Sequence, residues 1–278
     1  MHEIVVREEM AQGTMVKLVI VAPQIAAKGK AGQFIILRVN ETGERIPLTL
    51  ADLDQNAGTI TLCFQIVGKT TALLASLKVG GFVKDIAGPL GIPEHIVENQ
   101  VVVCIGGGTG IAVIHHITKA LSEKKNYVIS ILGARVYELI ILEHEMKQYS
   151  NELYITTDDG SYGIHGFVTD ALAKVLGERN DVNIVYAIGP IPMMKNVCKM
   201  TKNFDLPTKV SLNPIMVDGT GMCGGCRVEV DGQTKFCCVD GPHFDGHKVD
   251  WDSIIQRRNI FLRKEKISVL SSITSVKY

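Results

Sequence analysis

The glycine-rich segment after the apolar run 101–105 constrains the fold of this chain more than any other feature. The run is fully apolar, and Gly106, Gly107, Gly108 and Gly110 follow it at once, before a predicted helix over 111–123. Further along, predicted strands (127–132, 153–156 and 183–187) alternate with predicted helices (138–149, 168–176 and 192–202). Alternation of strands and helices at this spacing predicts a parallel, doubly wound α/β sheet.

The rest of the chain has a different pattern. Residues 1–98 contain short runs rich in β-branched residues (16–21, 33–39 and 59–66), which predict an antiparallel β-barrel or sandwich. Residues 209–250 are rich in Gly, Cys and Asp, and a helix is predicted from 251 to about 264. We therefore expect a β-barrel at 1–98, a nucleotide-binding α/β domain at 99–208, a small cysteine-rich subdomain at 209–250, and a C-terminal helix and tail at 251–278.

Composition excludes several classes of function. The chain has 29 basic and 29 acidic residues, so no charge excess indicates binding to nucleic acid or to an anionic membrane. The longest uncharged apolar run, 101–114, contains four glycines and is too short to insert across a bilayer. The first residues lack the core of a signal peptide, and four of the seven cysteines are clustered. These features predict a cytoplasmic protein with reduced thiols.

The clustered cysteines predict a metal centre. Cys223, Cys226, Cys237 and Cys238 lie within sixteen residues on a glycine-rich segment, and such thiolates hold zinc or an iron–sulfur cluster. A zinc ribbon needs two C-x2-C pairs, and this segment has one. The spacing is closer to that of plant-type 2Fe–2S sites, but Asp218 stands where the first of four cysteines is expected. The alternatives are a zinc site and a loop of free thiols.

Glycines and polar residues after the predicted strands indicate a nucleotide site. Gly107, Gly108, Thr109 and Gly110 open a helix, where backbone N–H groups bind a pyrophosphate; the alternative is a tight strand–helix turn. Asp159, Gly189 and Met193 follow later strands, at the edge of the sheet where such folds bind ligands. Met193 is expected either to contact a nicotinamide or to pack in the core. Arg135 would favour a 2′-phosphate and Glu138 a free 2′-hydroxyl, so the choice between NAD and NADP stays open.

The β-domain offers two further phosphate-binding segments. Arg45 and Thr49 lie on one predicted strand, and Gly68 and Thr71 precede a short predicted helix. Each segment read alone is more typical of ordinary strand and turn chemistry than of phosphate binding. No residue is identified as a general acid or base, and the consecutive histidines 115 and 116 are expected to be surface or packing residues.

In this order, the motifs resemble those of the ferredoxin–NADP reductase superfamily. They are Gly32-Gln-Phe34, Arg45-x-Pro-Leu-Thr49, Gly68-x-x-Thr71, Gly88-Pro-Leu-Gly91, Gly106-Gly-Gly-Thr-Gly110 and Gly189-Pro. The cysteine segment ending Cys238-Val-Asp-Gly-Pro242 is similar to that of the electron-transfer subunits of dihydroorotate dehydrogenase. An aspartate with three cysteines is closer still to the small subunits of NADH-dependent reduced ferredoxin:NADP oxidoreductase. Pro47-Leu48 replaces the tyrosine and serine common in the superfamily, as in the orotate-linked subgroup.

The resemblance implies cofactors, ligands and a partner. FAD would be held by Arg45, Pro47, Leu48, Thr49, Gly68 and Thr71. NAD(H), with NADP(H) as the alternative, would be held by Gly107, Gly108, Thr109, Gly110, Arg135, Asp159, Gly189 and Met193. The ligands of a 2Fe–2S cluster would be Asp218, Cys223, Cys226 and Cys238, with Cys237 a neighbour. The implied function is to move hydride between NAD(H) and FAD, and then single electrons through the cluster to a larger subunit with flavin and 4Fe–4S centres. The alternative partner is a dihydroorotate dehydrogenase.

Overall fold

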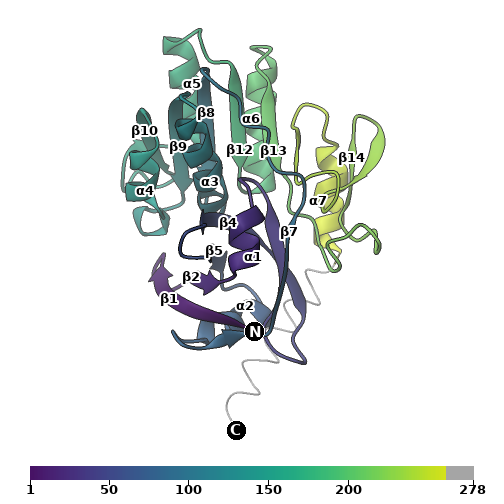
Figure 1. Ribbon diagram of the computed structural model, residues 1–278. Helices are drawn as coiled ribbons and strands as arrows, with labels where there is room; N and C mark the ends of the chain where they lie inside the picture. Colours follow the sequence, from purple (N-terminus) through teal and green to yellow (C-terminus); the bar gives the residue numbers. More distant parts are fainter. Residues whose placement is uncertain (261–278) are drawn as a thin grey trace.

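A seven-stranded antiparallel sheet forms the N-terminal part of the computed structural model, which describes residues 1–260 (Figure 1). Its strand order is β6-β1-β2-β5-β4-β3-β7. The strands are β1 (His2–Met10), β2 (Met15–Val21), β3 (Phe34–Arg38), β4 (Arg45–Asp54), β5 (Thr59–Gln65), β6 (Phe82–Val83) and β7 (Asp85–Leu90), with helices α1 (Pro23–Lys28) and α2 (Lys69–Ser76). Side chains at alternate positions of β2, Val16, Leu18 and Ile20, are buried in one core, as period-two strands require. This sheet confirms the expected β-domain.

Strand β4 has two halves with different neighbours. Its first half, Arg45 to Thr49, pairs with β3, whereas its second half, from Leu50 onward, pairs with β5. Between Leu50 and Asp52 the register with β5 shifts by one residue, so Ala51 is an extra residue in β4, a β-bulge. The first half of β4 therefore presents a free backbone edge on one side.

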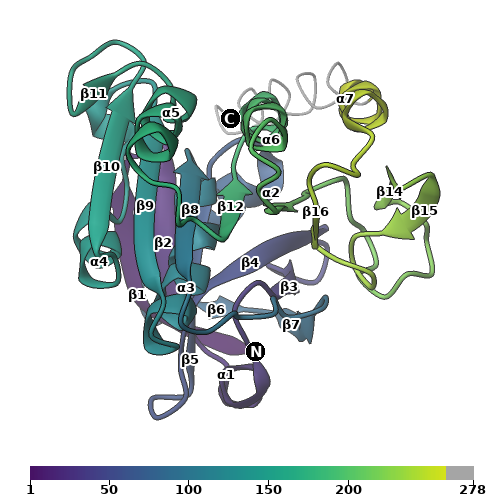
Figure 2. The ribbon, with the colours of Figure 1, turned by 90° about the horizontal axis from the view of Figure 1, so that it is seen from above.

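A second seven-stranded sheet forms the middle of the chain, in the order β11-β10-β9-β8-β12-β13-β16. Its strands are β8 (Val101–Gly107), β9 (Tyr127–Ala134), β10 (Glu152–Thr157), β11 (Ile164–His165), β12 (Ile184–Ile188), β13 (Thr208–Ser211) and β16 (His243–Asp245). All neighbours are parallel except β13 and β16. Helices α3 (Gly110–Glu123) and α4 (Glu143–Gln148) cover one face, and α5 (Val168–Glu178) and α6 (Ile191–Lys202) cover the other (Figure 2). This is the expected doubly wound sheet, and its order reverses between β8 and β12.

The helix expected over 138–149 is wrong. The structure has a one-turn 3-10 helix, η1 (Tyr137–Leu139), and then α4, separated by Leu142 with a φ of 54°. Leu139, Ile140, Ile141 and Leu142 all pack against the same core. Four consecutive apolar residues cannot lie on one face of a helix, so burial of all four excludes a continuous helix here.

The cysteine-rich part lies beside both sheets. It contains a hairpin, β14 (Arg227–Val230) and β15 (Gln233–Phe236), followed by β16 and by helix α7 (Trp251–Asn259), which contacts β14 and α6 (Figure 2). The side chain of Asp250 caps α7 by accepting the N–H of Ser253 at 3.1 Å. The expected end of this helix near 264 and the tail lie outside the described residues. Within residues 1–260, none of the helices is long and apolar enough to cross a membrane.

Candidate functional site

The glycine turn after β8 lies against the end of β12. A Cβ atom at Gly110 would overlap the carbonyl oxygen of Ile188, so only glycine allows α3 to start this close to β12. Likewise, a Cβ at Gly189 would lie 2.7 Å from Cε of Met193 and 3.0 Å from the carbonyl oxygen of Gly107. The structure therefore brings the expected nucleotide residues of β8 and β12 together at the point where the strand order reverses.

The side of this turn that carries Gly108 and Thr109 is open. Gly108 has a φ of 54°, and a Cβ atom there would meet no atom within 4 Å. Thr109 is exposed and makes no side-chain capping bond, and the first turn of α3 contains no acidic residue. The free N–H groups of a 14-residue helix are thus directed at an open space, which fits a phosphate group. Met193 is half-buried against the glycines, whereas Met194 is fully buried in the core.

Arg135 and Asp159 lie on neighbouring turns at the same edge of the sheet. The N–H of Asp159 donates to the carbonyl oxygen of Arg135 at 3.3 Å. The hydroxyl and N–H of Ser161 hold the pKa of Asp159 below its usual range, so this carboxylate is ionised at neutral pH. Arg135 and Glu138 are both exposed, and neither makes a bond that favours one nucleotide over the other.

The first half of β4 has the features of a flavin-binding strand. The five residues from Arg45 to Thr49 are all partly or fully exposed, although β-strands packed on a core normally alternate. Pro47 provides half-buried apolar surface for a flat ring, Leu48 beside it packs on the barrel core, and Arg45 provides a positive charge for a phosphate. The free backbone edge described above leaves hydrogen-bonding groups for a ring with polar atoms. These residues fit FAD.

Gly68 and Thr71 form the start of helix α2. The hydroxyl oxygen of Thr71 accepts the N–H groups of Val67 at 3.0 Å and Gly68 at 2.9 Å, and the hydroxyl donates to the carbonyl oxygen of Gly68. The Thr71 hydroxyl is therefore occupied in shaping the turn. The first turn of α2 contains no acidic residue, so its remaining N–H groups are suited to a phosphate.

Two of the expected cluster ligands form a close pair. The sulfur atoms of Cys226 and Cys238 lie 3.2 Å apart, which is a thiol contact and not a disulfide. Burial raises the pKa of Cys238 to about 12, and the backbone N–H of Gly221 lowers it in part. Gly221 belongs to the turn between Asp218 and Cys223, so this pair adjoins the other two expected ligands.

Asp218 and Cys223 form the second pair. The hydroxyl and N–H of Thr220 hold the pKa of Asp218 below its usual range, and the charge of Arg45 acts in the same direction. The backbone N–H of Gly225, 3.4 Å from the sulfur of Cys223, lowers the pKa of that thiol, as does the N–H of Asp218. Both side chains are thus held toward their ligating, ionised forms.

The donor set, two pairs of side chains, fits a two-iron cluster. Among residues 1–260, no three His, Cys, Asp or Glu side chains converge on one point that a metal ion would occupy. A cluster with two irons is instead held from two sides, by one pair of ligands on each iron. Cys237 is fully buried, and His243 and His247 bond to Gly32 and Thr201, away from the loop.

A cavity of about 250 Å³ links the expected flavin strand to the cysteine loop. Arg45 and Asp218 both line it, together with Ile36 of β3. A Cβ at Gly219 would lie 2.7 Å from Cγ1 of Ile36, so the loop rests directly on the barrel. The structure therefore places the expected FAD and cluster residues side by side.

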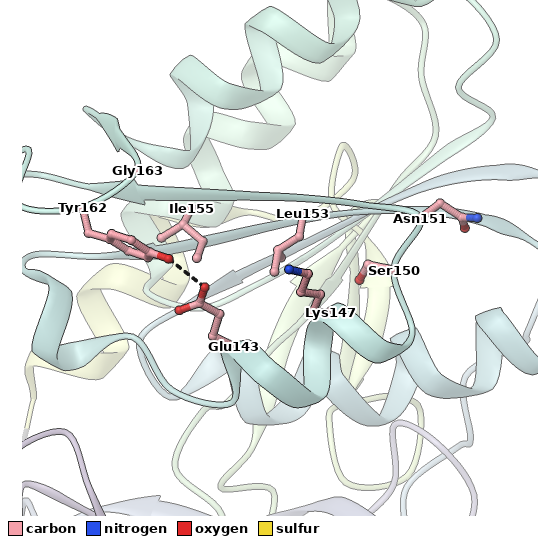
Figure 3. A pocket seen from close by; sticks show the side chains of 8 residues that line it. All are labelled: Glu143, Lys147, Ser150, Asn151, Leu153, Ile155, Tyr162 and Gly163. Carbon is pink, nitrogen blue, oxygen red and sulfur yellow. Dashed lines mark hydrogen bonds between the residues drawn. The ribbon is translucent and has the colours of Figure 1, made fainter.

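A larger cavity, about 470 Å³, lies elsewhere, between α4 and β10 (Figure 3). Tyr162 donates to Glu143 at 2.9 Å across its mouth, and Lys147 projects toward Leu153 (Figure 3). The turn that carries Asp159 borders this cavity, but its lining shares no residue with the expected FAD, nucleotide and cluster sites.

Two family profiles match the chain. Residues 104–199 match the oxidoreductase NAD-binding domain. Residues 213–250 match the iron–sulfur cluster binding domain of dihydroorotate dehydrogenase B. The second match contains all four expected ligands and identifies the cysteine loop as an iron–sulfur site, which removes the zinc and free-thiol alternatives.

Curated relatives cover most of the chain. A dihydroorotate dehydrogenase B (NAD(+)) electron transfer subunit homolog from Thermotoga maritima is 47% identical over 247 residues, 89% of this chain and 87% of the relative. The chain belongs to the family of dihydroorotate dehydrogenase B electron-transfer subunits and their homologues. A member from Fusobacterium nucleatum is 31% identical over 76% of this chain and 83% of its own length.

Two solved structures are similar to this chain, one over almost its whole length and one in fold alone. A chain of the NADH-dependent reduced ferredoxin–NADP oxidoreductase, from work on flavin-based electron bifurcation, superposes with a TM-score of 0.92. It is 43% identical, and 98% of each chain is covered. A cytochrome P450 reductase from Amycolatopsis, 19% identical with a TM-score of 0.60 over 73% of this chain and 65% of that one, shares the fold alone.

The sequence did not identify the role of two histidines. His115 and His116, expected at the surface or in simple packing, are buried, and both bond to β4. A signal was present, because Ile111, His115 and Thr118 follow the i, i+4, i+7 spacing of one helix face. A polar ring on that apolar face indicates a buried partner.

Proposed function

We propose that this chain is the NAD(H)-linked subunit of an NADH-dependent reduced ferredoxin–NADP oxidoreductase. When bound, FAD, NAD(H) and a 2Fe–2S cluster would supply hydride exchange and single-electron transfer to a larger subunit with flavin and 4Fe–4S centres. The observation that carries the proposal is the pairing of Asp218 with Cys223, where a fourth cysteine is the common ligand. The likeness over 98% of both chains to the solved oxidoreductase supports it.

In this proposal, the chain's own residues bind and orient FAD. Arg45 neutralises phosphate charge, and the N–H groups that start α2 after Gly68 provide a second anion contact. Pro47 packs against the ring and Thr49 faces it from the same side of the strand, whereas Leu48 packs on the barrel core and offers the ring its backbone. None of these side chains is a general acid or base, and none is needed, because hydride moves with its electron pair and without a separate proton transfer.

The nucleotide is bound at the end of the parallel sheet. The N–H groups of Thr109 and Gly110 hold the pyrophosphate, since that of Gly108 donates to the carbonyl oxygen of Gly133. Gly189 and Met193 limit the space on the β12 side. Arg135 and Asp159 lie at the far end of this edge, where an adenosine would be bound. We propose NAD(H) as the nucleotide, with NADP(H) as the alternative.

Four side chains would hold the cluster, as two pairs. Asp218 and Cys223 would bind one iron, and Cys226 and Cys238 the other. An aspartate oxygen is a harder donor than a thiolate, and ligand identity tunes the reduction potential of such clusters. Cys237, fully buried beside Cys238, would pack beneath the cluster and not bind it.

The surface around the cysteine loop supports a protein partner. Met222, next to Cys223, is 88% exposed, and Ile215, Val217 and Val239 are also exposed. Apolar side chains gathered around one loop are typical of interaction surfaces. We propose that the larger subunit covers this loop and receives electrons there.

Two further expectations join the proposal. We propose domain limits near residues 98 and 208, a cluster subdomain at 209–250 that adds strand β16 to the second sheet, and a C-terminal helix and tail from 251. We also propose a cytoplasmic location, because all seven cysteines are free thiols, as a reducing compartment maintains them.

Anaerobic purification of the chain with its natural partners tests the function. The expected preparation contains flavin, two irons per chain and a larger subunit that binds flavin and NADP and reduces ferredoxin. Identification of that subunit by mass spectrometry, and NADPH oxidation that requires both NAD and ferredoxin, would confirm the assembly. A preparation without iron or flavin would refute the proposal.

A second candidate function is favoured by the matched cluster-domain profile, which is that of dihydroorotate dehydrogenase B. The chain would then transfer electrons between NAD and a dihydroorotate-oxidising subunit. The same purification separates the two candidates. A copurifying subunit that oxidises dihydroorotate, with no response to ferredoxin, would establish the second.

A further inference from the structure

Two consecutive histidines on α3 reach across to strand β4. Nδ1 of His116 lies 2.9 Å from the carbonyl oxygen of Leu50, and Nδ1 of His115 lies 3.1 Å from that of Ala51. Both rings are buried, at 8% and 6% exposure. These bonds join the nucleotide-binding part of the chain to the barrel.

The carbonyl acceptors determine which nitrogen of each ring carries a hydrogen. A carbonyl oxygen only accepts, so each Nδ1 must carry a hydrogen and donate it. Burial lowers the pKa of His116, so its ring is neutral at neutral pH. Nε2 of His115 is buried with no hydrogen-bond partner among the described residues. A leucine would fill the space without that cost, so the bond to β4 is what the histidine adds.

The acceptors belong to the β-bulge of β4. Leu50 lies opposite Leu62 of β5, Asp52 lies opposite Thr61, and Ala51 is the extra residue between them. A bulge leaves its extra residue outside the ladder of strand pairing. Its backbone is therefore available to a group from outside the sheet, and the histidines supply the donors.

Two other contacts lie at the same place. Nζ of Lys119, one turn beyond His115, lies 2.8 Å from Oδ1 of Asp52. Ala51 is also buried in one apolar cluster with Ile111 and Ile114 of α3. We call these contacts, made by His115, His116 and Lys119 with Leu50, Ala51 and Asp52, the α3–β4 seam.

The α3–β4 seam lies between the two proposed cofactor sites. Gly110, at the start of α3, is five residues before His115, and Thr49, in the flavin strand, directly precedes Leu50. We propose that His115 and His116 are positioning residues that fix the glycine turn against the flavin strand, so that the nicotinamide and the flavin meet at a set distance. This inference rests on the proposed function for its kinetic consequence alone.

Paired variants test the hydrogen bond itself. His116→Leu removes the donor and keeps most of the volume, whereas His116→Asn keeps an N–H close to the position of Nδ1. His144→Leu, an exposed histidine on α4, is the matched control. We expect His116→Leu to slow flavin reduction at saturating NADH about tenfold, since misplacement of reacting groups is costly. The dissociation constant for NAD should change less than about twofold, and Asn should restore the rate.

Amide hydrogen exchange gives a readout that does not depend on turnover. We expect the amides of β4 from Leu50 to Asp54 to exchange about tenfold faster in His116→Leu than in the wild type, by the logic of local opening. His116→Asn should match the wild type. Lys119→Met should raise the exchange rate of the same amides by a smaller factor. Lys119 is partly exposed, so this variant tests the seam without changing a buried side chain.

Each outcome decides the inference. Flavin reduction at the wild-type rate in His116→Leu would overturn it, as would failure of a folded His116→Asn to restore the rate. If the wild-type chain binds no flavin, the proposed function fails, and hydrogen exchange still decides the seam. Equal exchange in the wild type, His116→Leu and Lys119→Met would then show that the histidines only pack.

Discussion

The sulfur atoms of Cys226 and Cys238 lie 3.2 Å apart, although eleven residues separate them in the sequence. Between them, the hairpin β14–β15 reverses the chain and returns Cys238 to Cys226. Cys237 is carried back with it and is fully buried, but the close sulfur contact is made by Cys238. The hairpin thus selects one of two adjacent thiols.

This selection predicts different results for two neighbouring substitutions. Cys238→Ser should lose most of the two irons per chain, because an alcohol is a poor replacement for a thiolate ligand. Cys237→Ser should keep the iron and lose about 1–2 kcal/mol of stability, because it buries a hydroxyl in an apolar site. Iron analysis and the visible spectrum measure both. Iron loss in Cys237→Ser alone would reverse the ligand assignment.

Asp218 is expected to be a replaceable ligand. Asp218→Cys should keep two irons per chain and change the electron spin resonance of the reduced cluster, since a thiolate is a softer donor. Asp218→Ala should weaken cluster binding by more than the roughly tenfold that loss of a hydrogen-bond partner of a metal ligand costs, because it removes a ligand itself. Asp205→Ala is the control, an exposed aspartate after α6 and outside the cysteine loop. An unchanged resonance in Asp218→Cys would contradict ligation at 218.

The close approach of Gly110 to Ile188 predicts a site intolerant of any side chain. Gly110→Ala should destabilise the chain by about 2–3 kcal/mol, because the methyl group meets backbone and not a movable side chain. Gly177→Ala on α5 is the matched control, because a Cβ there meets nothing within 4 Å. That change should be neutral or stabilise by up to about 1 kcal/mol. Urea denaturation of both variants checks the difference, and equal midpoints would refute it.

Stability should depend on pH through His243. Burial lowers the pKa of His243 from 6.5 to about 4, and the charge of Lys209 acts in the same direction. The folded pKa is the lower one, so as pH falls the unfolded chain binds the proton before the folded chain does. The free energy of unfolding therefore decreases as pH falls from 6.5 to about 4. The decrease amounts to about 3 kcal/mol across that window. Burial raises the pKa of the neighbouring Glu94, which acts in the opposite direction.

A variant isolates the histidine from the glutamate. His243→Gln keeps an N–H near the carbonyl oxygen of Gly32, which Nε2 of His243 contacts at 3.1 Å, and removes the titration. Denaturation at several pH values should therefore show a shallower loss of stability in the variant between pH 6.5 and 4. Parallel curves for the wild type and the variant would contradict the assignment.

Strong local patterns predicted the fold well. The apolar run before Gly106 and the periodic helix after Gly110 are features of short-range sequence, and the structure has β8 and α3 there. The helix expected over 138–149 was wrong because its apolar residues are all buried by tertiary contacts, which helical periodicity does not report. The pairing of β16 with β13 joins distant segments and left no local signal.

The candidate site was predictable in its residue types and less so in its connections. Glycine turns and the cysteine spacing are local patterns, and they were enough to identify both cofactor regions from the sequence. The contact of Arg45 and Asp218 with one cavity joins residues 173 positions apart, which spacing alone does not reveal. The buried bonds of His115 and His116 to the bulge depend on how two parts of the chain pack, and a bulge is not visible in sequence.

Strand β16 gives the cysteine-rich segment a role in the architecture of its neighbour. It lies only five residues after Cys238 and forms the outer strand of the parallel sheet, against β13. A chain cut after residue 208 would break β13 and leave an edge with unpaired N–H and C=O groups, a template for aggregation. The iron-binding segment is therefore part of the second sheet, and we expect a shortened chain made by deleting it to aggregate.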